Sequence, residues 1–462
     1  MENNEVIHIF RKIQKNSIEI KIKKKRYQIK YPKYIWDKFP KSLHKVFADS
    51  LTHISTWHIP LINQASVVYH FPHPPIESVF FKMLFYSLPM NVFENKELKT
   101  SSLLKNFYNA NFLTQFKSLN YFYSGKKVKK QLKNNAIILF SFGKDTLLTY
   151  GLLNELGVNT ILIFIKEPYS IFENHHKKKL AERFFKQFKK EVEFFPLSVG
   201  KLRQSEGLFW GWDIILSQYA FTLLPYFFYY QAKYLFFGNE QSCNFYVKDD
   251  EGYFVNPVFE QSISGMQLLQ NIPKLFFIST HIGSLVEPIN EIFITYILHH
   301  RYSELGKYQM SCFSEETEAK KRRWCGVCEK CARMYIFFKA LGISPDKVGF
   351  YNNDMLSLKK ENYYVIFNNK IESTYGGSGL GKDEQLLAFY LAYKRGAKGE
   401  LIEKFKKIFL SEVEKRKERL IDEYFGIHSS YSLPSALRKR VLNIFETERK
   451  KVLKEIRRTI NK

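Results

Sequence analysis

Between residues 136 and 238 the chain alternates short apolar segments with longer, more polar ones, and this alternation constrains the fold more than any other feature. The longer segments carry helical patterning, so we expect helices over 144–156, over 175–190 and around 213–231. Short apolar strands separated by helices are typical of an α/β fold, with a parallel sheet and helices on both faces. The expected strands are AIILFS (136–141), ILIFIK (161–166), VEFFPL (192–197) and KYLFFG (233–238).

Ligands in such sheets bind beyond the carboxyl ends of the strands. Three candidate segments lie at these ends: Ser141–Thr146, Lys166-Glu167 and Gly238-Asn239-Glu240. Within the third, Asn239 and Glu240 could bind Mg²⁺ or a substrate, or they could simply form a turn.

The first segment, SFGKDT at 141–146, joins a strand directly to a helix. A glycine-containing turn at a helix start gathers free backbone N–H groups and the positive end of the helix dipole, which favours a bound phosphate. Lys144 adds a point charge that can follow a phosphate. Ser141 and Thr146 offer hydroxyls, and Asp145 could hold Mg²⁺ or orient the loop. An ordinary strand-to-helix turn is the alternative.

SFGKDT resembles the SGGxDS pyrophosphate loop of the ATP pyrophosphatase (PP-loop) family, which cleaves ATP to AMP and diphosphate while adenylating a substrate. The resemblance implies an adenine nucleotide alpha hydrolase-like domain with Lys144, Asp145 and Glu240 as catalytic residues. Two positions depart from the motif. Thr146 replaces a serine but keeps the hydroxyl, whereas Phe142 replaces a glycine and could narrow the phosphate site or require another backbone conformation. The implied ATP and Mg²⁺ ligands are Ser141, Phe142, Gly143, Lys144, Asp145, Thr146, Asn239 and Glu240.

A cluster of cysteines is the second strong signal. Four of the five cysteines fall within residues 312–331, which favours a metal site in a reducing, cytoplasmic compartment over an extracellular disulfide framework. Four thiolates satisfy tetrahedral Zn²⁺, so structural zinc is the prediction; an iron–sulfur cluster or four unrelated thiols are the alternatives. Cys243 has no partner in the sequence and is predicted to be buried. The predicted ligands are Cys312, Cys325, Cys328 and Cys331, flanked by Arg322, Arg323 and Arg333.

A PP-loop followed by four cysteines resembles 7-cyano-7-deazaguanine synthase and its relatives, which carry such a zinc site. Further segments resemble the ATP-dependent epimerases of UDP-N-acetylmuramoyl-L-alanyl-L-glutamate, a peptidoglycan precursor. The likeness covers about residues 136–396 and implies a carboxylate-bearing small-molecule substrate. The segments are FFGNEQSCN (236–244), VNPVFEQS (255–262), LVEPINEIFITYIL (285–298), MSCF (310–313), WCGVCEKC (324–331) and GGSGLGKDEQLLAFYLAYKRG (376–396).

Several polar residues in these segments have both a functional and a structural interpretation. Asn256, Glu260 and Gln261 could recognise the acceptor substrate. His281 could carry a proton, although a lone histidine is more often structural. Helix capping competes with function at Glu287 and Asn290, and His299-His300 is predicted to end a helix. GGSGLGKD (376–383) has the spacing of a nucleotide-binding P-loop but carries Asp383 where Ser or Thr would hold Mg²⁺, so a glycine-rich substrate loop is favoured.

The whole chain is predicted to contain three regions: an N-terminal α+β domain (1–133), the nucleotide-binding domain with its zinc site (134–345), and a mostly helical C-terminal region (346–462). The net charge of +26 could attract nucleic acid. However, the basic residues are spread along the chain, so nucleic acid is not the favoured partner. The apolar stretch 213–237 contains Asp213, Pro225 and Lys233, which favours a buried helix and strand over a membrane span.

The leading hypothesis is an ATP-dependent enzyme that forms AMP and diphosphate while activating a carboxylate. The epimerase resemblance would make that carboxylate the terminal glutamate of the wall precursor. A deazaguanine-synthase-like or tRNA-modifying PP-loop enzyme is one alternative. A non-catalytic, zinc-stabilised nucleotide sensor is another, motivated by Phe142.

Overall fold

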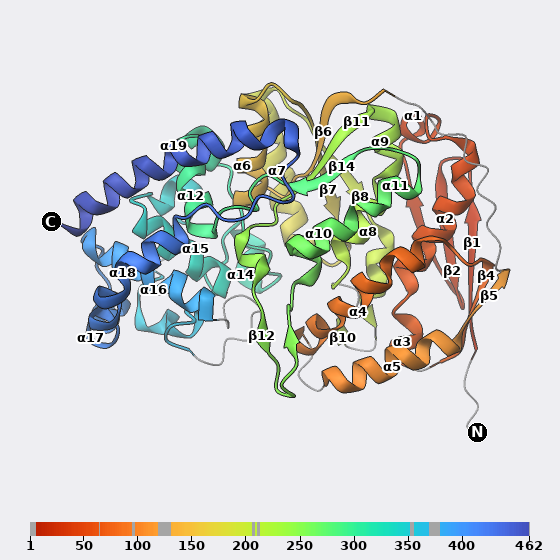
Figure 1. The fold of residues 1–462 in the computed structure, drawn as a ribbon, viewed down its shortest axis with the longest axis horizontal. Helices are drawn as coiled ribbons and strands as arrows, with labels where there is room; N and C mark the ends of the chain where they lie inside the picture. Colours follow the sequence, from red (N-terminus) through yellow and green to blue (C-terminus); the bar gives the residue numbers. More distant parts are fainter. Residues whose placement is uncertain are drawn as a thin grey trace.

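The computed structural model describes residues 6–63, 65–94, 98–118, 131–205, 208–209, 213–351, 355–368 and 379–461. Its middle region contains a five-stranded sheet of order β14-β11-β6-β7-β8 (Figure 1). Every strand pairing in this sheet is parallel, which confirms the predicted parallel sheet. The strands are β6 (Lys133–Leu139), β7 (Asn159–Lys166), β8 (Val192–Pro196), β11 (Ala232–Phe237) and β14 (His281–Ser284).

The order of these strands determines where a ligand can enter. From β6 the chain moves outward through β7 to β8, then returns to β11 on the other side of β6 and continues to β14. The connections that leave β6 and β11 therefore diverge, and a crevice opens between the carboxyl ends of these two strands. SFGKDT follows β6 and Gly238 follows β11, so both border this crevice.

The helices between the strands match the sequence expectation with two differences. One helix was expected around 213–231, but two are found, α8 (Ile215–Thr222) and α9 (Leu224–Tyr230). Pro225 lies in the first turn of α9, where its missing N–H is tolerated, so the helix restarts there. The other two helices are α6 (Lys144–Glu155) and α7 (Ile171–Phe188), and α7 begins earlier than the expected residue 175.

The early start of α7 depends on a distant residue. Glu315 accepts hydrogen bonds from the backbone N–H groups of Phe172, at 2.9 Å, and Glu173, at 3.2 Å. A carboxylate at this end of a helix satisfies free N–H donors and interacts favourably with the helix dipole. No local sequence pattern around residue 171 could have predicted that α7 begins there.

Helices cover both faces of the sheet, as expected, and each face belongs to a different hydrophobic core. On one face, Ile138 and Phe140 pack in a core with α6, α7 and α12. On the other, Ile137 and Ile163 share a core with α8 and α9. The further helices and strands of the middle region are β9 (Gln204–Ser205), β10 (Leu208–Phe209), β12 (Val247–Lys248), β13 (Phe254–Val255), α10 (Ile263–Leu269), α11 (Asn271–Leu275), α12 (Glu291–His300), α13 (Ser303–Gly306), α14 (Thr317–Lys321) and α15 (Glu329–Ala340).

The N-terminal region forms a second five-stranded sheet, of order β3-β2-β1-β4-β5, with antiparallel and parallel pairings. It shares the second core with the central sheet. For example, Phe47 stacks on Phe221 of α8 with ring centroids 5.6 Å apart, and the Tyr31 hydroxyl donates to the Thr222 carbonyl at 3.0 Å. Its elements are β1 (Ile7–Ile13), β2 (Ser17–Ile22), β3 (Lys25–Lys30), α1 (Lys33–Trp36), α2 (Lys41–Thr56), α3 (Ile59–Asn63), β4 (Val67–Pro72), α4 (Ile76–Glu94), α5 (Thr100–Leu113) and β5 (Thr114–Ser118).

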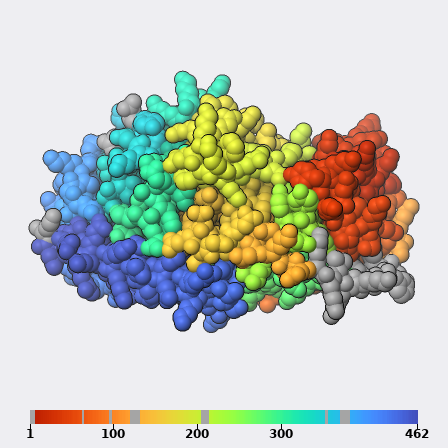
Figure 2. All heavy atoms as spheres, turned by 90° about the horizontal axis from the view of Figure 1, so that it is seen from above, coloured from red at the N-terminus to blue at the C-terminus, as the bar shows by residue number. Residues whose placement is uncertain are grey.

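The C-terminal region is helical and lies at the opposite end of the molecule from the N-terminal sheet (Figures 1 and 2). A segment before its last helix covers the edge strand β14: the Ser284 N–H donates to the Ser432 hydroxyl at 3.1 Å. Among the described residues we find no helix with the length and apolar character that a membrane-spanning segment requires. The helices are α16 (Gly379–Lys394), α17 (Glu400–Ile408), α18 (Leu410–Tyr424) and α19 (Ser435–Ile460).

Candidate functional site

A cavity of about 1130 Å³ lies at the carboxyl ends of β6, β7 and β11. All three segments chosen from the sequence contribute to its lining, although Lys144, Lys166 and Glu240 do not line it. Small-molecule sites typically measure roughly 300–1,000 Å³, so this cavity is large enough for a nucleotide-sized ligand. The lining residues from the three segments are Ser141, Asp145, Thr146, Glu167, Gly238 and Asn239.

Phe142 does not narrow the cavity, because its side chain points into the hydrophobic core. The ring is fully buried and lies 4.7 Å from the ring of Phe140 and 5.7 Å from that of Phe184, centroid to centroid. Its backbone φ is +57°, in the left-handed region that glycine adopts most easily. Phe142 therefore has a backbone conformation that is more usual for glycine than for a residue with a side chain.

The turn after β6 is fixed from outside by two backbone contacts. The Phe142 carbonyl accepts a hydrogen bond from the Met310 N–H at 2.8 Å. The buried Lys177 ammonium of α7 donates both to the Ser141 carbonyl and, at 2.6 Å, to the Met310 carbonyl. The segment that leads into Cys312 is thus tied directly to SFGKDT.

The polar atoms of the turn are close together and face the start of α6. The Ser141 hydroxyl lies 3.4 Å from the Thr146 hydroxyl and accepts from the Gly143 N–H at 3.3 Å. At Gly238, an added Cβ would lie only 2.6 Å from the Cβ of Asp145. Glycine is therefore required there for β11 to approach the turn this closely.

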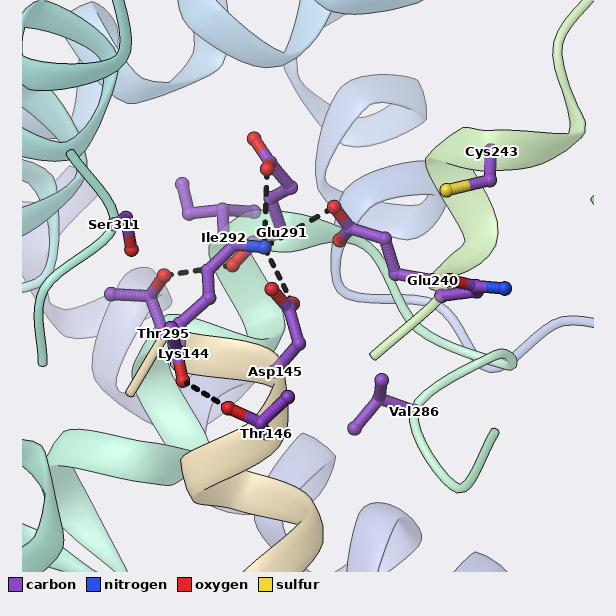
Figure 3. A network of polar contacts seen from close by, with 12 residues as sticks. Lys144, Asp145, Thr146, Glu240, Cys243, Val286, Glu291, Ile292, Thr295 and Ser311 are labelled. Carbon is purple, nitrogen blue, oxygen red and sulfur yellow. Dashed lines mark hydrogen bonds and ion pairs between the residues drawn. The ribbon is translucent and has the colours of Figure 1, made fainter. Parts of the chain in front are cut away.

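Lys144 is buried beneath the turn, at the centre of a network of charges (Figure 3). Its side chain is 1% exposed, and its ammonium lies 2.6 Å from Asp145, 3.2 Å from Glu240 and 3.1 Å from Glu291. Burial alone would lower the pKa of Lys144, but the nearby carboxylates raise it well above its usual value. Lys144 is therefore charged, and its present contacts are with carboxylates.

The two glutamates beside Lys144 have opposite pKa shifts. Burial raises the pKa of Glu240 well above its usual value. The pKa of Glu291 is lowered well below its usual value despite burial, because Arg333, Lys144 and Lys330 surround it. Glu291 is thus the carboxylate that three cationic side chains share, whereas Glu240 contacts only Lys144 among the ion pairs of the described residues.

The sequence had not singled out Glu291. Its neighbours Glu287 and Asn290 were considered, and both make structural contacts: Glu287 accepts from the Tyr431 N–H at 2.9 Å, and Asn290 donates to the Glu423 carbonyl at 3.1 Å. The only sequence signal for Glu291 is an acidic residue at the start of an apolar helix. That signal is the same for an ordinary first-turn carboxylate.

The predicted acceptor residues divide between cavity and scaffold. Gln261 lines the cavity. Asn256 donates to the Cys243 carbonyl and accepts from the Val258 N–H, both at 2.9 Å. Glu260 accepts from the backbone N–H groups of Leu216 and Ser217 at the start of α8. A substrate-binding role for all three stays a prediction.

Other polar residues weighed from the sequence have structural partners. His281 contacts the Ser432 carbonyl at 2.8 Å, and His299 contacts Gln309 at 2.7 Å. Burial lowers the pKa of His299 to about 4. Of GGSGLGKD, residues 376–378 lie outside the described residues, while Asp383 lies in α16 and forms an ion pair with Arg416.

The four clustered cysteines converge as predicted. Their four sulfur atoms all lie within 4.8 Å of one another, and the sulfurs of Cys325 and Cys331 are 3.7 Å apart. A tetrahedron with metal–sulfur bonds of about 2.3 Å has sulfur–sulfur edges of about 3.8 Å. The cluster Cys312, Cys325, Cys328 and Cys331 could therefore hold a metal ion such as zinc.

Backbone geometry supports a metal site at the same cysteines. The Val327 N–H points at the Cys325 sulfur and the Cys331 N–H at the Cys328 sulfur, both at 3.4 Å. Gly326, which lies between Cys325 and Val327, has a φ of +70° and so supplies the left-handed residue of this tight turn. Such N–H groups stabilise sulfur that carries negative charge, as a metal-bound thiolate does.

Comparisons of the chain with models of known protein families, with curated protein sequences and with solved structures returned no match. What supports a function is therefore the geometry of the chain itself. The cavity at the switch point of a parallel sheet, the turn at its base and the adjacent cysteine cluster are the relevant features.

Proposed function

We propose that this chain is an ATP-dependent adenylating enzyme of the PP-loop type, which forms AMP and diphosphate while it activates a carboxylate. The observation that carries the proposal is the conformation of the SFGKDT turn. Phe142 adopts the left-handed backbone of a glycine and turns its side chain away from the cavity. The larger of the two departures from the family motif therefore leaves the space for a phosphate open.

The residues around the turn have different roles in this proposal. The Ser141 and Thr146 hydroxyls, with the backbone at the start of α6, bind the diphosphate portion of ATP. Asp145 lines the cavity and would hold Mg²⁺, which offsets the negative charge on the departing diphosphate. Lys144 orients Asp145 through their 2.6 Å contact.

In this reaction a carboxylate oxygen attacks the α-phosphorus of ATP. The bond between that phosphorus and the bridging oxygen breaks, and diphosphate leaves with the bonding electrons. For the terminal glutamate of UDP-N-acetylmuramoyl-L-alanyl-L-glutamate, activation would acidify the adjacent C–H, so that a base removes the proton and an acid returns it to the opposite face. Water then cleaves the acyl-adenylate to AMP and the D-glutamate form.

The test is release of AMP and diphosphate from ATP and Mg²⁺, with and without UDP-N-acetylmuramoyl-L-alanyl-L-glutamate. AMP that forms only with this acceptor, together with inverted chirality of the recovered glutamate, would support both steps. AMP with another carboxylate alone would support a deazaguanine-synthase-like enzyme. Failure to form AMP with any tested acceptor would contradict adenylation.

Two aspartate variants provide the matched comparison. Asp145→Asn removes the charge that would hold Mg²⁺, so AMP formation should fall by about 100-fold or more. Asp250→Asn makes the same chemical change at an exposed position outside the cavity and should leave the rate unchanged. Equal rates in the two variants would argue against this role of Asp145.

The position of Lys144 favours one alternative, a nucleotide sensor. The lysine of the turn is buried among carboxylates and is not exposed to the cavity, so it does not meet a phosphate in this arrangement. A sensor would bind ATP without turnover. ATP binding with no AMP under any condition would favour it over the enzyme.

A further inference from the structure

The charged residues that line the cavity are unevenly distributed. Most of them are acidic, and the basic ones among the described lining residues are only Lys330 and Arg333, both in the first two turns of α15. Asp145, Glu167 and Glu173 are paired with Lys144, Arg203 and Lys177, which do not line the cavity. Lys330 and Arg333 place positive charge on the lining itself, where it attracts a ligand that carries phosphate groups. The acidic lining residues are Asp145, Glu167, Glu173, Glu315, Glu316 and Glu329.

Lys330 and Arg333 are held in place by one buried carboxylate. The Lys330 ammonium lies 2.9 Å from one oxygen of Glu291, and the Arg333 Nε lies 3.0 Å from the other. The same oxygen that meets Lys330 also lies 3.1 Å from the Lys144 ammonium. Glu291 thus connects the basic end of the cavity to the turn after β6.

Lys330 retains the capacity to bind a ligand in this arrangement. Its side chain is 23% exposed, whereas Glu291 is 2% exposed. An ammonium group has three N–H donors, and Glu291 takes one of them. Arg333 carries a planar guanidinium whose shape suits phosphate oxygens. Its Nε faces Glu291, and one of its terminal nitrogens lies 3.9 Å from Glu329, so it adds positive charge beside Lys330.

The cysteine cluster fixes the backbone that carries both residues. Cys328 caps the start of α15 with its sulfur, and Cys331 follows Lys330 directly. Val327 and Cys328 themselves line the cavity. Lys330 is therefore positioned between two of the four clustered cysteines, and its place in the cavity depends on their geometry.

We propose that Lys330 and Arg333 form a diphosphate-binding subsite at the α15 end of the cavity. This inference rests on the proposed function for the source of the diphosphate, which is either ATP or a nucleotide-diphosphate-linked acceptor. Lys144, by contrast, stabilises the turn from below. The subsite gives the predominantly acidic cavity a second place for an anionic group, beside α15, in addition to the turn after β6.

The experiment measures binding of inorganic diphosphate, ATP, AMP and UDP-N-acetylglucosamine to the full chain by calorimetry in the presence of Mg²⁺. Lys330→Gln should weaken diphosphate binding by about 10-fold or more, as expected for loss of a charge-assisted hydrogen bond. Lys330→Arg should restore much of it. Lys339→Gln changes a lysine of the same helix that does not line the cavity, and should bind like the unaltered protein.

The four ligands distinguish the two sources of the diphosphate. If the subsite binds ATP, Lys330→Gln weakens the binding of ATP but leaves the binding of AMP unchanged. If the subsite binds the acceptor, the variant weakens the binding of the UDP-sugar and leaves the binding of ATP unchanged. Diphosphate binding that is absent in the unaltered protein, or equal in Lys330→Gln, would overturn the subsite.

The subsite and the proposed function can fail separately. Loss of diphosphate binding in Lys330→Gln without AMP formation by the unaltered protein would leave the subsite intact and refute adenylation. AMP formation by the unaltered protein, together with unchanged diphosphate binding in Lys330→Gln, would support adenylation and refute the subsite. Metal content is measured for each variant, so that weaker binding caused by loss of a cysteine-bound metal is not attributed to loss of the lysine side chain.

Discussion

At Phe142 the backbone and the side chain have opposite preferences. A φ of +57° disfavours any residue with a Cβ, and such strain costs about 1–3 kcal/mol. The buried ring in contact with Phe140 and Phe184 offsets that cost, since burying an aromatic side chain contributes several kcal/mol. A turn with this backbone conformation can therefore tolerate phenylalanine when the core beneath it accepts the ring.

This balance predicts an unusual order of stability for two variants. Phe142→Ala and Phe142→Gly both lose the ring and should each reduce the free energy of unfolding by about 3–5 kcal/mol. Glycine should be the less damaging of the two, by about 1 kcal/mol, because it relieves the left-handed backbone. Urea denaturation measures both values.

Phe185 provides the matched control for this pair. It is exposed, lies next to Phe184 within α7 and has helical backbone. There alanine should be more stable than glycine by about 1 kcal/mol, the usual helical preference. The same order at both positions would show that the backbone at Phe142 is not strained.

Asp213 predicts a pH dependence of stability. Its side chain is buried, and burial raises its pKa to about 7. A carboxyl group whose pKa is higher in the folded state stabilises the fold fully at low pH, and this contribution is lost as the pH rises towards and through 7. The contribution of Asp213 to the free energy of unfolding should therefore fall by roughly 3 kcal/mol between pH 5 and pH 8.

Asp213→Asn, which stays neutral, should remove the share of the decline that Asp213 contributes when denaturation is repeated across the pH range. The exposed Asp250→Asn should follow the unaltered protein. Glu260, whose pKa is raised to about 8 by burial, contributes a decline of the same sign that Asp213→Asn leaves in place. A curve for Asp213→Asn that matches the original protein would contradict the assignment.

Among the secondary-structure elements, α15 connects the cysteine cluster to the cavity. We expect one metal ion per chain, and zinc should be found by elemental analysis; iron and visible colour would favour an iron–sulfur cluster instead. Removal by a chelator should lower the melting temperature by about 5 °C or more, because metal binding contributes to folding. It should also weaken diphosphate binding, since Lys330 is positioned by this turn.

Cys328→Ser and Cys243→Ser separate this effect from loss of any thiol. The first removes a member of the cluster and should reduce metal content. The second changes a buried cysteine that lies outside the cluster and should leave metal content unchanged. Equal metal content in both variants would exclude the cluster as the binding site.

The sequence predicted elements that carry a strong local pattern and missed those that depend on distant partners. Strands such as ILIFIK were recognised because an apolar run of strand length is a local property. The edge strand β14 has only four residues, HIGS, and no apolar run. Its place in the sheet comes from pairing with β11 and from Ser432.

The candidate site shows the same division. SFGKDT and the cysteine cluster were evident from spacing alone. Glu291, Lys330 and Arg333 were not singled out as cavity residues, because their proximity to the turn arises only when α12 packs against α6 and α15 packs against α12. The direction of the Phe142 side chain was equally inaccessible, since it depends on the position of Phe184.

For the whole molecule, the two hydrophobic cores extend across the regions suggested by the sequence. The core on one face of the central sheet contains side chains from both the N-terminal region and the middle region. We therefore expect a fragment that begins at residue 131 to be insoluble or to unfold without a cooperative transition. Co-expression with residues 1–130 should restore solubility, whereas a soluble, cooperatively folding fragment would show that the middle region is independent.

The cover over β14 has a consequence for synthesis of the protein. Ser432, which hydrogen-bonds to Ser284, is translated 148 residues later. At 5–20 residues per second, a ribosome needs about 7 to 30 s to make that length. Throughout this interval the nascent sheet has an open edge that can pair with another chain. Its rate of translation, or a chaperone that shields the edge, will therefore influence how much of the newly made protein escapes aggregation.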